Sequence, residues 1–210
     1  MHQMIKRLFG NRKSSSHSAA NMNKELEALI KKSSVFTSDL GCRFRTLAQN
    51  AEQFLLHRAD VTKCVEAGKS DQALALKAIL DNPSGHLDET IVEFAMPLLL
   101  FRLVLDSLHA CFSGKHTYGY VRAKLNEADD ALTEAVSKAS TVKELIKLLQ
   151  RRLADKPEAQ RAMNELSSVF TACSQQAKCR LNKFLKAAIK EMRKKFNKVT
   201  LKIVSLSDPF

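Results

Sequence analysis

The chain has 210 residues, enough for one good-sized domain, and 45% of them are hydrophobic, so it can bury a core. It contains no Trp, only six Gly and only four Pro, a composition that favours helices over a many-stranded sheet. The net charge of +12 predicts a polyanionic partner, either nucleic acid or an anionic membrane surface. No run reaches the roughly 20 apolar residues of a membrane span, so any membrane contact is expected to be peripheral.

Residues 1–22 are predicted to be a basic amphipathic segment followed by a Ser-rich linker. One face of a short helix here would hold four apolar residues that we expect to insert into a membrane: Met4, Ile5, Leu8 and Phe9. The bases of the segment are expected to bind lipid: Lys6, Arg7, Arg12 and Lys13. A mitochondrial transit peptide and a disordered terminus are the alternatives, since the segment is basic, contains Ser and has no acid.

Three long helices are predicted in a single domain over 23–207. Apolar residues recur at steps of three and four over 23–67, over 86–154 and over 157–206. A helix over 23–67 would run roughly 68 Å, and such a length needs a packing partner along all of it. The residues between the first two stripes, 66–72 and 81–85, are typical of helix ends and turns.

Prolines and glycines predict where these helices bend or turn. Pro97 is expected to kink the second helix, and the glycines of 113–120 to bend it. Pro157 fits the first turn of the third helix, with Asp155 as its N-cap and Glu158 as the capping-box partner. Residues 153–157 would then be the tip of a helical hairpin. The predicted fold class is all-α: an elongated, kinked, antiparallel three-helix bundle that buries its remaining apolar surface by dimerising.

The positive charge is concentrated in three segments. Residues 1–24 hold five bases and no acid, residues 138–162 hold seven bases and three acids, and residues 178–202 hold ten bases and one acid. Like charges four residues apart destabilise a helix. A polyanionic surface would compensate for this repulsion, at roughly 1 kcal/mol per base near an anionic bilayer.

The stretch LADKPEAQRAMNEL (153–166) resembles the tip between the second and third helices of the BAR domain in sorting nexins. Residues 35–75, 96–132 and 179–206 are similar in layout to parts of the family's three helices. The resemblance implies a crescent-shaped dimer, formed with itself or with another BAR protein, that binds anionic membrane and senses or generates curvature. It also implies a cytoplasmic protein, peripheral on an endosome or another vesicle, that acts in vesicle trafficking.

Residue roles follow from the same resemblance. The lipid-binding bases would lie at the tip and on the third helix: Lys147, Arg151, Arg152, Lys156, Lys178, Arg180, Lys183 and Lys186. The dimer interface would hold Phe36, Leu40, Phe44, Leu47, Phe184, Ile189 and Phe196. No segment is long enough for the phosphoinositide-binding PX domain of sorting nexins. Phosphoinositides are candidates among the anionic lipids. The family's usual means of recognising them specifically, the PX domain, is however not expected here.

Other functions have weaker support in the sequence. An enzyme is not expected, because the chain lacks a Gly-rich phosphate loop, an HExxH motif and a GxSxG motif. No cofactor or metal is expected, since His109 and Cys111 would lie on different faces of a helix. One alternative is nucleic-acid binding through 178–202, which the scarcity of Tyr and Trp disfavours. The others are calmodulin binding by the same segment and a helical adaptor or tether without curvature activity.

Overall fold

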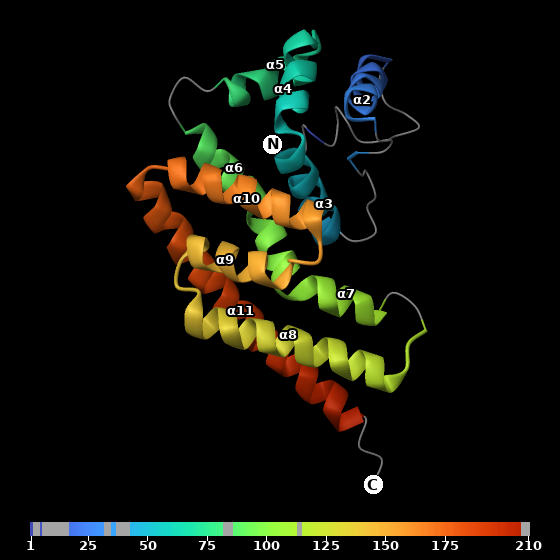
Figure 1. The fold of residues 1–210 in the computed structure, drawn as a ribbon, viewed down its shortest axis with the longest axis vertical. Helices are drawn as coiled ribbons and strands as arrows, with labels where there is room; N and C mark the ends of the chain where they lie inside the picture. The colour runs from blue at the N-terminus through green and yellow to red at the C-terminus, as the bar shows by residue number, and fades with distance from the viewer. Residues whose placement is uncertain are drawn as a thin grey trace. The chain divides into compact units, whose positions relative to one another are not determined.

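The computed structural model describes residues 17–31, 43–81, 86–112 and 115–206, together with residues 1, 5, 35 and 36. Every regular element in this part of the chain is a helix, which confirms the all-α prediction (Figure 1). The chain divides into two compact units. Unit 1 contains residues 1–98 and 153–173, and unit 2 contains residues 99–152 and 174–210.

Unit 1 is built from helices at both ends of its sequence: α2 (His17–Ile30), α3 (Arg43–Leu56), α4 (Arg58–Ala67), α5 (Asp71–Leu80), most of α6 (Leu87–Leu100) and α10 (Pro157–Ala172). Helix α10 packs against α3, and α4 contacts both α2 and α5. The rings of Phe54 and Phe94 meet edge to face, with their centroids 5.3 Å apart. Segments distant in the sequence therefore share this unit's core.

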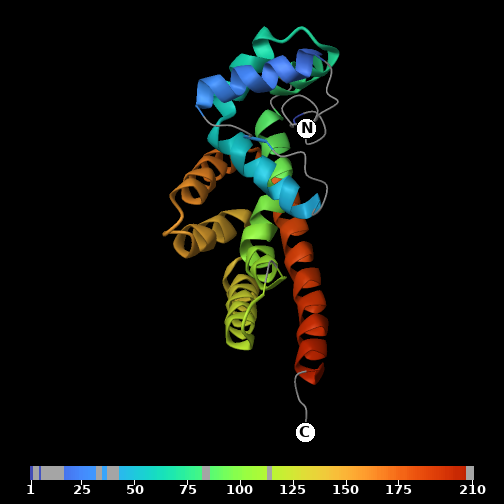
Figure 2. The ribbon, with the colours of Figure 1, turned by 90° about the vertical axis from the view of Figure 1, so that its right-hand side faces the viewer.

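The elements of unit 2 are arranged around one helix, α8. These elements are the π-helical turn η1 (Phe101–Leu105), α7 (Asp106–Phe112), α8 (Tyr118–Lys138), α9 (Val142–Arg152) and α11 (Gln175–Leu206). Helix α8 contacts η1, α7, α9 and α11. The Val142 N–H, just beyond the end of α8, donates to Asn182 Oδ1, while Asp129 pairs with Arg193. Because the later residue of one helix meets the earlier residue of the other, α8 and α11 run in opposite directions (Figure 2).

The three predicted long helices are divided into shorter ones. The first, 23–67, covers α3, α4 and the part of α2 from residue 23 onward, with residues 32–34 and 37–42 outside the described residues. Helix α2 begins earlier, at His17, within the segment predicted to be a linker. The second, 86–154, is α6, η1, α7, α8 and α9, and the third, 157–206, is α10 and α11. The expected stop near 66–72 is present, where a Cβ on Gly68 would lie 2.7 Å from Ala73 Cβ, so only glycine fits this turn.

The prolines behave in two different ways. Pro97 lies inside α6, and the π-helical turn η1 follows at Phe101. Pro157 is in the first turn of α10, as predicted. The predicted cap was wrong, because the N-cap is Lys156, whose side chain makes no capping hydrogen bond, and Asp155 lies in the preceding turn. The helices flanking this turn, α9 and α10, belong to different units.

A capping box that the sequence analysis did not identify begins α9. Glu144 Oε2 accepts hydrogen bonds from the Ser140 hydroxyl (2.8 Å) and the Thr141 N–H (2.9 Å), while the Glu144 N–H donates to Thr141 Oγ1 (3.2 Å). The hydrogen bond from Ser140 is the main reason that the pKa of Glu144 lies below its usual value. This reciprocal pairing satisfies backbone donors at the helix start. It therefore fixes the point where α8 ends and the chain turns into α9.

We predict that Thr141→Ala lowers the free energy of unfolding by about 1 kcal/mol, because the variant loses the cap of α9. Urea denaturation followed by circular dichroism measures the change. Thr133→Ala is the matched control, since Thr133 is exposed within α8 and Ala favours a helix interior. Equal destabilisation by the two substitutions would contradict a capping role for Thr141.

Candidate functional site

Nearly all of the chain's excess positive charge belongs to unit 2. Unit 2 has nineteen Lys and Arg against eight Asp and Glu, a net charge of +11, whereas unit 1 has fifteen against fourteen. The overall charge of +12 is therefore a property of one unit. A candidate site for an anionic partner must be sought there.

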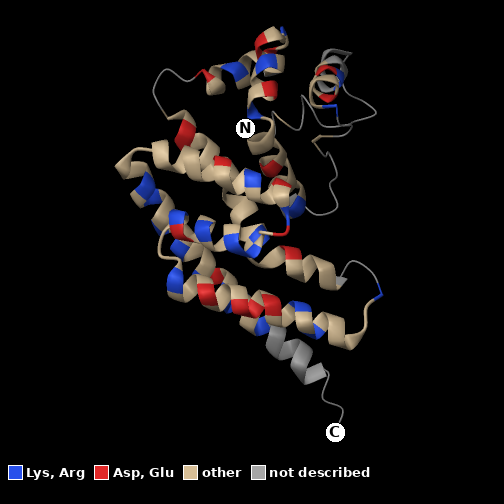
Figure 3. Cartoon of the chain, in the orientation of Figure 1, with Lys and Arg blue, Asp and Glu red and all other residues tan. Residues whose placement is uncertain are grey.

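Half of the acids of unit 2 lie on α8 (Figure 3), and two of them, Asp129 and Glu134, pair with bases of neighbouring helices. Asp129 accepts a hydrogen bond from the Arg193 guanidinium of α11. Glu134 lies within 3.6 Å of Lys138 Nζ, 3.4 Å of Arg151 Nη2 and 3.6 Å of Arg152 Nε. Helix α8 therefore neutralises part of the basic charge from within the unit.

This pairing separates the predicted tip bases into groups. Arg151 and Arg152 are ion-paired with Glu134. Lys147 is exposed and has no ion-pair partner among the described residues. Lys156 is exposed but belongs to unit 1. The structure therefore does not bring the four predicted tip bases together within one unit.

Most of the predicted third-helix bases are exposed, and some of them have no ion-pair partner among the described residues. Along α11 a buried stripe holds Ala177, Leu181, Leu185, Ile189 and Phe196. The opposite side carries four exposed lysines without an ion-pair partner in the described part of the chain: Lys183, Lys186, Lys190 and Lys194. We call these four residues the α11 lysine face. Lys178, which is half-buried, and Arg180, which is exposed, precede it near the start of the helix.

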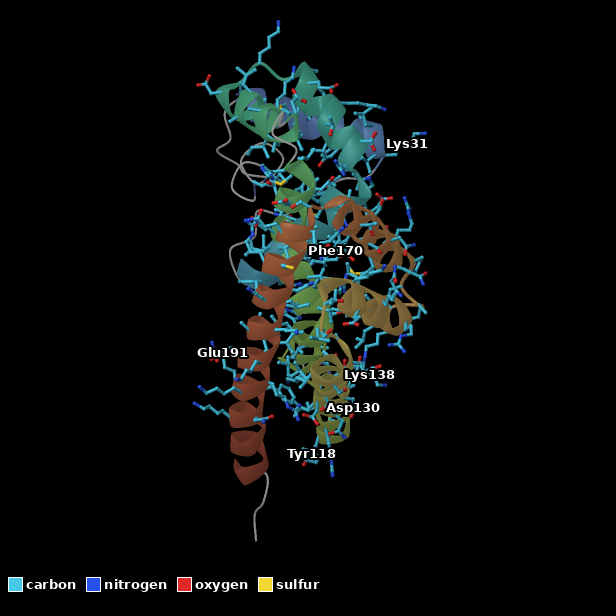
Figure 4. The ribbon with its side chains drawn as sticks, turned by 90° about the vertical axis from the view of Figure 1, so that its left-hand side faces the viewer. Lys31, Tyr118, Asp130, Lys138, Phe170 and Glu191 are labelled. Carbon is cyan, nitrogen blue, oxygen red and sulfur yellow. The ribbon has the colours of Figure 1, made fainter. Side chains whose placement is uncertain are left out.

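Two members of this face, Lys190 and Lys194, were missing from the predicted site. Their signal was the four-residue repeat from Lys186, which places all three on one side of a helix. The nearest acid in the sequence, Glu191, lies 3.9 Å from Lys195 Nζ. Figure 4 shows Glu191 on the side of α11 away from α8, where Asp130 and Lys138 are labelled. Among the described residues, the acids of α8 pair with arginines of α9 and α11 and with no lysine of this face.

A second basic stripe lies on α9. Lys143, Lys147 and Arg151 recur every four residues and are exposed, while Leu145, Ile146 and Leu149 are buried on the other side of the helix. Helices α9 and α11 contact each other, and each carries its bases opposite its own buried residues. The bases of α9 and α11 therefore form two stripes on different sides of unit 2.

The predicted insertion and interface residues are described only in part. Of the predicted insertion and lipid-binding residues in 1–22, Ile5 alone is described and it is fully buried, whereas Met4, Lys6, Arg7, Leu8, Phe9, Arg12 and Lys13 lie outside the described residues. Insertion of Ile5 into a membrane would require it to leave this buried position. Leu40 also lies outside the described residues, and only the helical backbone of Phe44 is described.

The remaining interface residues differ in exposure. Phe36, Ile189 and Phe196 are buried within their own chain, and Leu47 is half-buried. Phe184 on α11 is 56% exposed. Among the described residues of the predicted interface, Phe184 therefore offers the most surface to a second molecule.

Features of other kinds of site are few in the described residues. No group of three or more His, Cys, Asp or Glu there could hold a metal ion. Burial raises the pKa of the Cys64 thiol to about 11, so this thiol is protonated at neutral pH and a poor nucleophile. No helix in the described part of the chain combines the length and apolar character needed to cross a bilayer.

Comparisons with known proteins add no family. No protein-family model matches the chain, and no curated protein or solved structure does. The resemblance to BAR domains therefore rests on the sequence alone.

We predict that Glu134→Gln makes the protein bind a cation exchanger more tightly than Glu165→Gln does. Both substitutions remove one acid, but only the first releases Arg151 and Arg152 from an ion pair, because Glu165 is exposed on α10. The free energy of unfolding should change by less than about 1 kcal/mol, as is usual for surface ion pairs. Identical salt concentrations at elution would show that Glu134 does not mask these arginines.

Proposed function

We propose that this protein binds anionic membrane surfaces peripherally, through unit 2, in a binding role rather than a catalytic one. The observation that carries the proposal is the α11 lysine face, four exposed lysines without an ion-pair partner among the described residues. A flat array of phosphate-bearing headgroups matches an extended stripe along one helix. Lysines on such a stripe keep their apolar stems near the interface and their charges in water.

Repulsion among its lysines favours binding of the α11 lysine face to an anionic partner, but four lysines provide only a modest binding free energy. Like charges at four-residue spacing cost a few tenths of a kcal/mol per pair, roughly 0.2–0.5 kcal/mol. Near an anionic bilayer each lysine contributes about 1 kcal/mol, so four contribute about 4 kcal/mol, which corresponds to a millimolar Kd. Stable attachment therefore needs a second contact or a second copy of the face.

A BAR-type dimer would provide the second copy. In this part of the proposal, the chain pairs with itself or with another BAR protein, forms a kinked three-helix crescent, and senses or generates curvature on an endosome or another vesicle. The resemblance at 153–166 and the exposed Phe184 support it. The N-terminal segment would add an amphipathic wedge beside the bases.

Nucleic-acid binding is the main competitor, because phosphates of a duplex would also be attracted to the basic surface. The α11 lysine face contains no arginine, and Arg193 is engaged with Asp129. Arginine forks are the usual choice for bidentate phosphate and base recognition, whereas lysines act as point charges. The composition of the face therefore favours a lipid surface over a nucleic acid. A helical adaptor without curvature activity would need no lysine face at all.

We predict that Lys183→Gln/Lys190→Gln weakens binding to phosphatidylserine-containing vesicles about 30-fold, since two charges contribute about 2 kcal/mol. Co-sedimentation over a range of lipid concentrations measures the affinity. The matched control is Lys63→Gln/Lys69→Gln, which removes two exposed lysines from unit 1 and should bind like the wild type. Tight, salt-dependent binding to duplex DNA without vesicle binding would overturn the proposal.

The dimer is tested separately from lipid binding. We expect the wild type to sediment as a dimer with an elongated scattering profile, and Phe184→Ser to shift the equilibrium toward monomer. Leu74→Ser is the control, because Leu74 is similarly exposed, at 53%, but lies in unit 1. A compact wild-type monomer would eliminate the crescent while leaving the lysine face intact. Tubulation of anionic vesicles by the wild type then tests curvature generation.

A further inference from the structure

An exposed aromatic cluster lies at the start of α8. It consists of His116, Tyr118 and Tyr120, which we call the aromatic cap, with Lys115 and Arg122 on either side. Tyr118 is 61% exposed and Tyr120 is 38% exposed. These are the chain's only two tyrosines, and the chain has no Trp. All the tyrosines of the chain therefore lie in one short stretch of unit 2.

The cap is held in place by local contacts. The rings of His116 and Tyr120 stack with centroids 4.4 Å apart and planes at 22°. Thr117 caps the helix, because its hydroxyl accepts a hydrogen bond from the Tyr120 N–H at 3.3 Å. Two of the three rings are therefore fixed before any partner arrives, which lowers the entropy lost on binding.

The charge around the cap is positive. No acid occurs from Lys115 to Lys124, and the first acid of α8, Glu127, pairs with Lys124 at 2.6 Å. The remaining acids of α8 lie further along the helix and include Asp129 and Glu134, which pair with bases. The cap therefore combines exposed aromatic rings with Lys115 and Arg122, in a stretch without acids to repel an anionic surface.

The cap lies at the end of unit 2 that also holds the last turns of α11. Helices α8 and α11 run in opposite directions, and Asp129 meets Arg193. Tyr118 precedes Asp129 by eleven residues, so it lies about 16 Å from Asp129 toward the start of α8. Helix α11 runs in this same direction after Arg193, past Lys194 and Lys198. Figures 1 and 2 show the start of α8 and the last turns of α11 at the same end of unit 2, and Figure 4 labels Tyr118 there.

We propose that the aromatic cap is a second membrane contact, whose tyrosine rings settle at the boundary between headgroups and acyl chains while Lys115 and Arg122 bind lipid phosphates. Tyrosine favours this boundary because its ring is apolar and its hydroxyl is polar. The inference rests on the proposed function and deepens it, since the lysine face alone is too weak for stable attachment. The cap residues lie at the predicted bend of 113–120 and would supply the missing contact.

Tyrosine fluorescence tests the cap directly, because Tyr118 and Tyr120 are the only tyrosines and there is no Trp to mask them. The full chain is mixed with phosphatidylserine-containing vesicles whose acyl chains carry bromine, a contact quencher. We expect the tyrosine emission to fall with brominated vesicles but not with matched unbrominated ones. Acrylamide, a quencher dissolved in the water, should then quench the vesicle-bound protein less than the free protein.

Two variants separate ring chemistry from folding. Tyr118→Ser/Tyr120→Ser should weaken vesicle co-sedimentation several-fold, whereas Tyr118→Phe/Tyr120→Phe should keep most of the affinity because the rings remain. Circular dichroism and urea denaturation check that both variants fold as the wild type does. Equal, wild-type affinity of both folded variants would overturn the inference.

The outcomes for the cap and for the proposed function can be told apart. If the wild type binds anionic vesicles but brominated lipid leaves the tyrosine emission unchanged, the cap is no membrane contact and the proposed function stands. Absence of vesicle binding overturns both. Tyrosine quenching by single-stranded oligonucleotides, without quenching by brominated lipid, would identify base stacking by the cap and likewise overturn the inference.

Discussion

The positive charge that unit 2 leaves exposed depends on how helix α8 places acids among an excess of bases. Asp129 and Glu134 meet arginines of α11 and α9, and α8 contacts every other element of the unit. Each of these ion pairs lies near the surface and contributes little by itself. Their shared effect is to let two strongly basic helices pack against a common neighbour. The bases left over then point outward, on the α11 lysine face and the exposed side of α9.

The ion pairs of unit 2 divide its bases into those with an acidic partner inside the unit and those that an external partner could bind. Arg151, Arg152 and Arg193 have acidic partners within the unit, while Lys183, Lys186 and Lys190 have none among the described residues. The bases of other helices that α8 pairs with are arginines, whose planar guanidinium suits fixed geometry, whereas the α11 lysine face consists of lysines, which suit a diffuse anionic surface. A count of bases along the sequence treats both sets alike. The structure shows which of them a partner can reach.

Sequence patterns predicted the features that depend on neighbouring residues. The helical class, the first-turn position of Pro157 and the exposed side of α11 followed from composition, proline chemistry and periodicity. The capping box of Thr141 and Glu144 was also readable, since Ser or Thr three residues before Glu is its signature. Other features required tertiary structure. The apolar stripe that holds Ile189 and Phe196 has the same sequence pattern whether its own chain or a second copy covers it. The contact between Arg151 and Glu134 spans seventeen residues, so no pattern of neighbouring residues predicted it.

The chain moves between the two units at three places, after residues 98, 152 and 173. Each change of unit lies beside a helix irregularity: Pro97 and η1, the turn before Pro157, and the break between α10 and α11. Neither unit is therefore a continuous stretch of sequence. During synthesis, unit 1 cannot be completed until α10 has left the ribosome, and unit 2 waits for α11. The α11 lysine face is therefore synthesised after all the acids of α8, which precede it in the sequence.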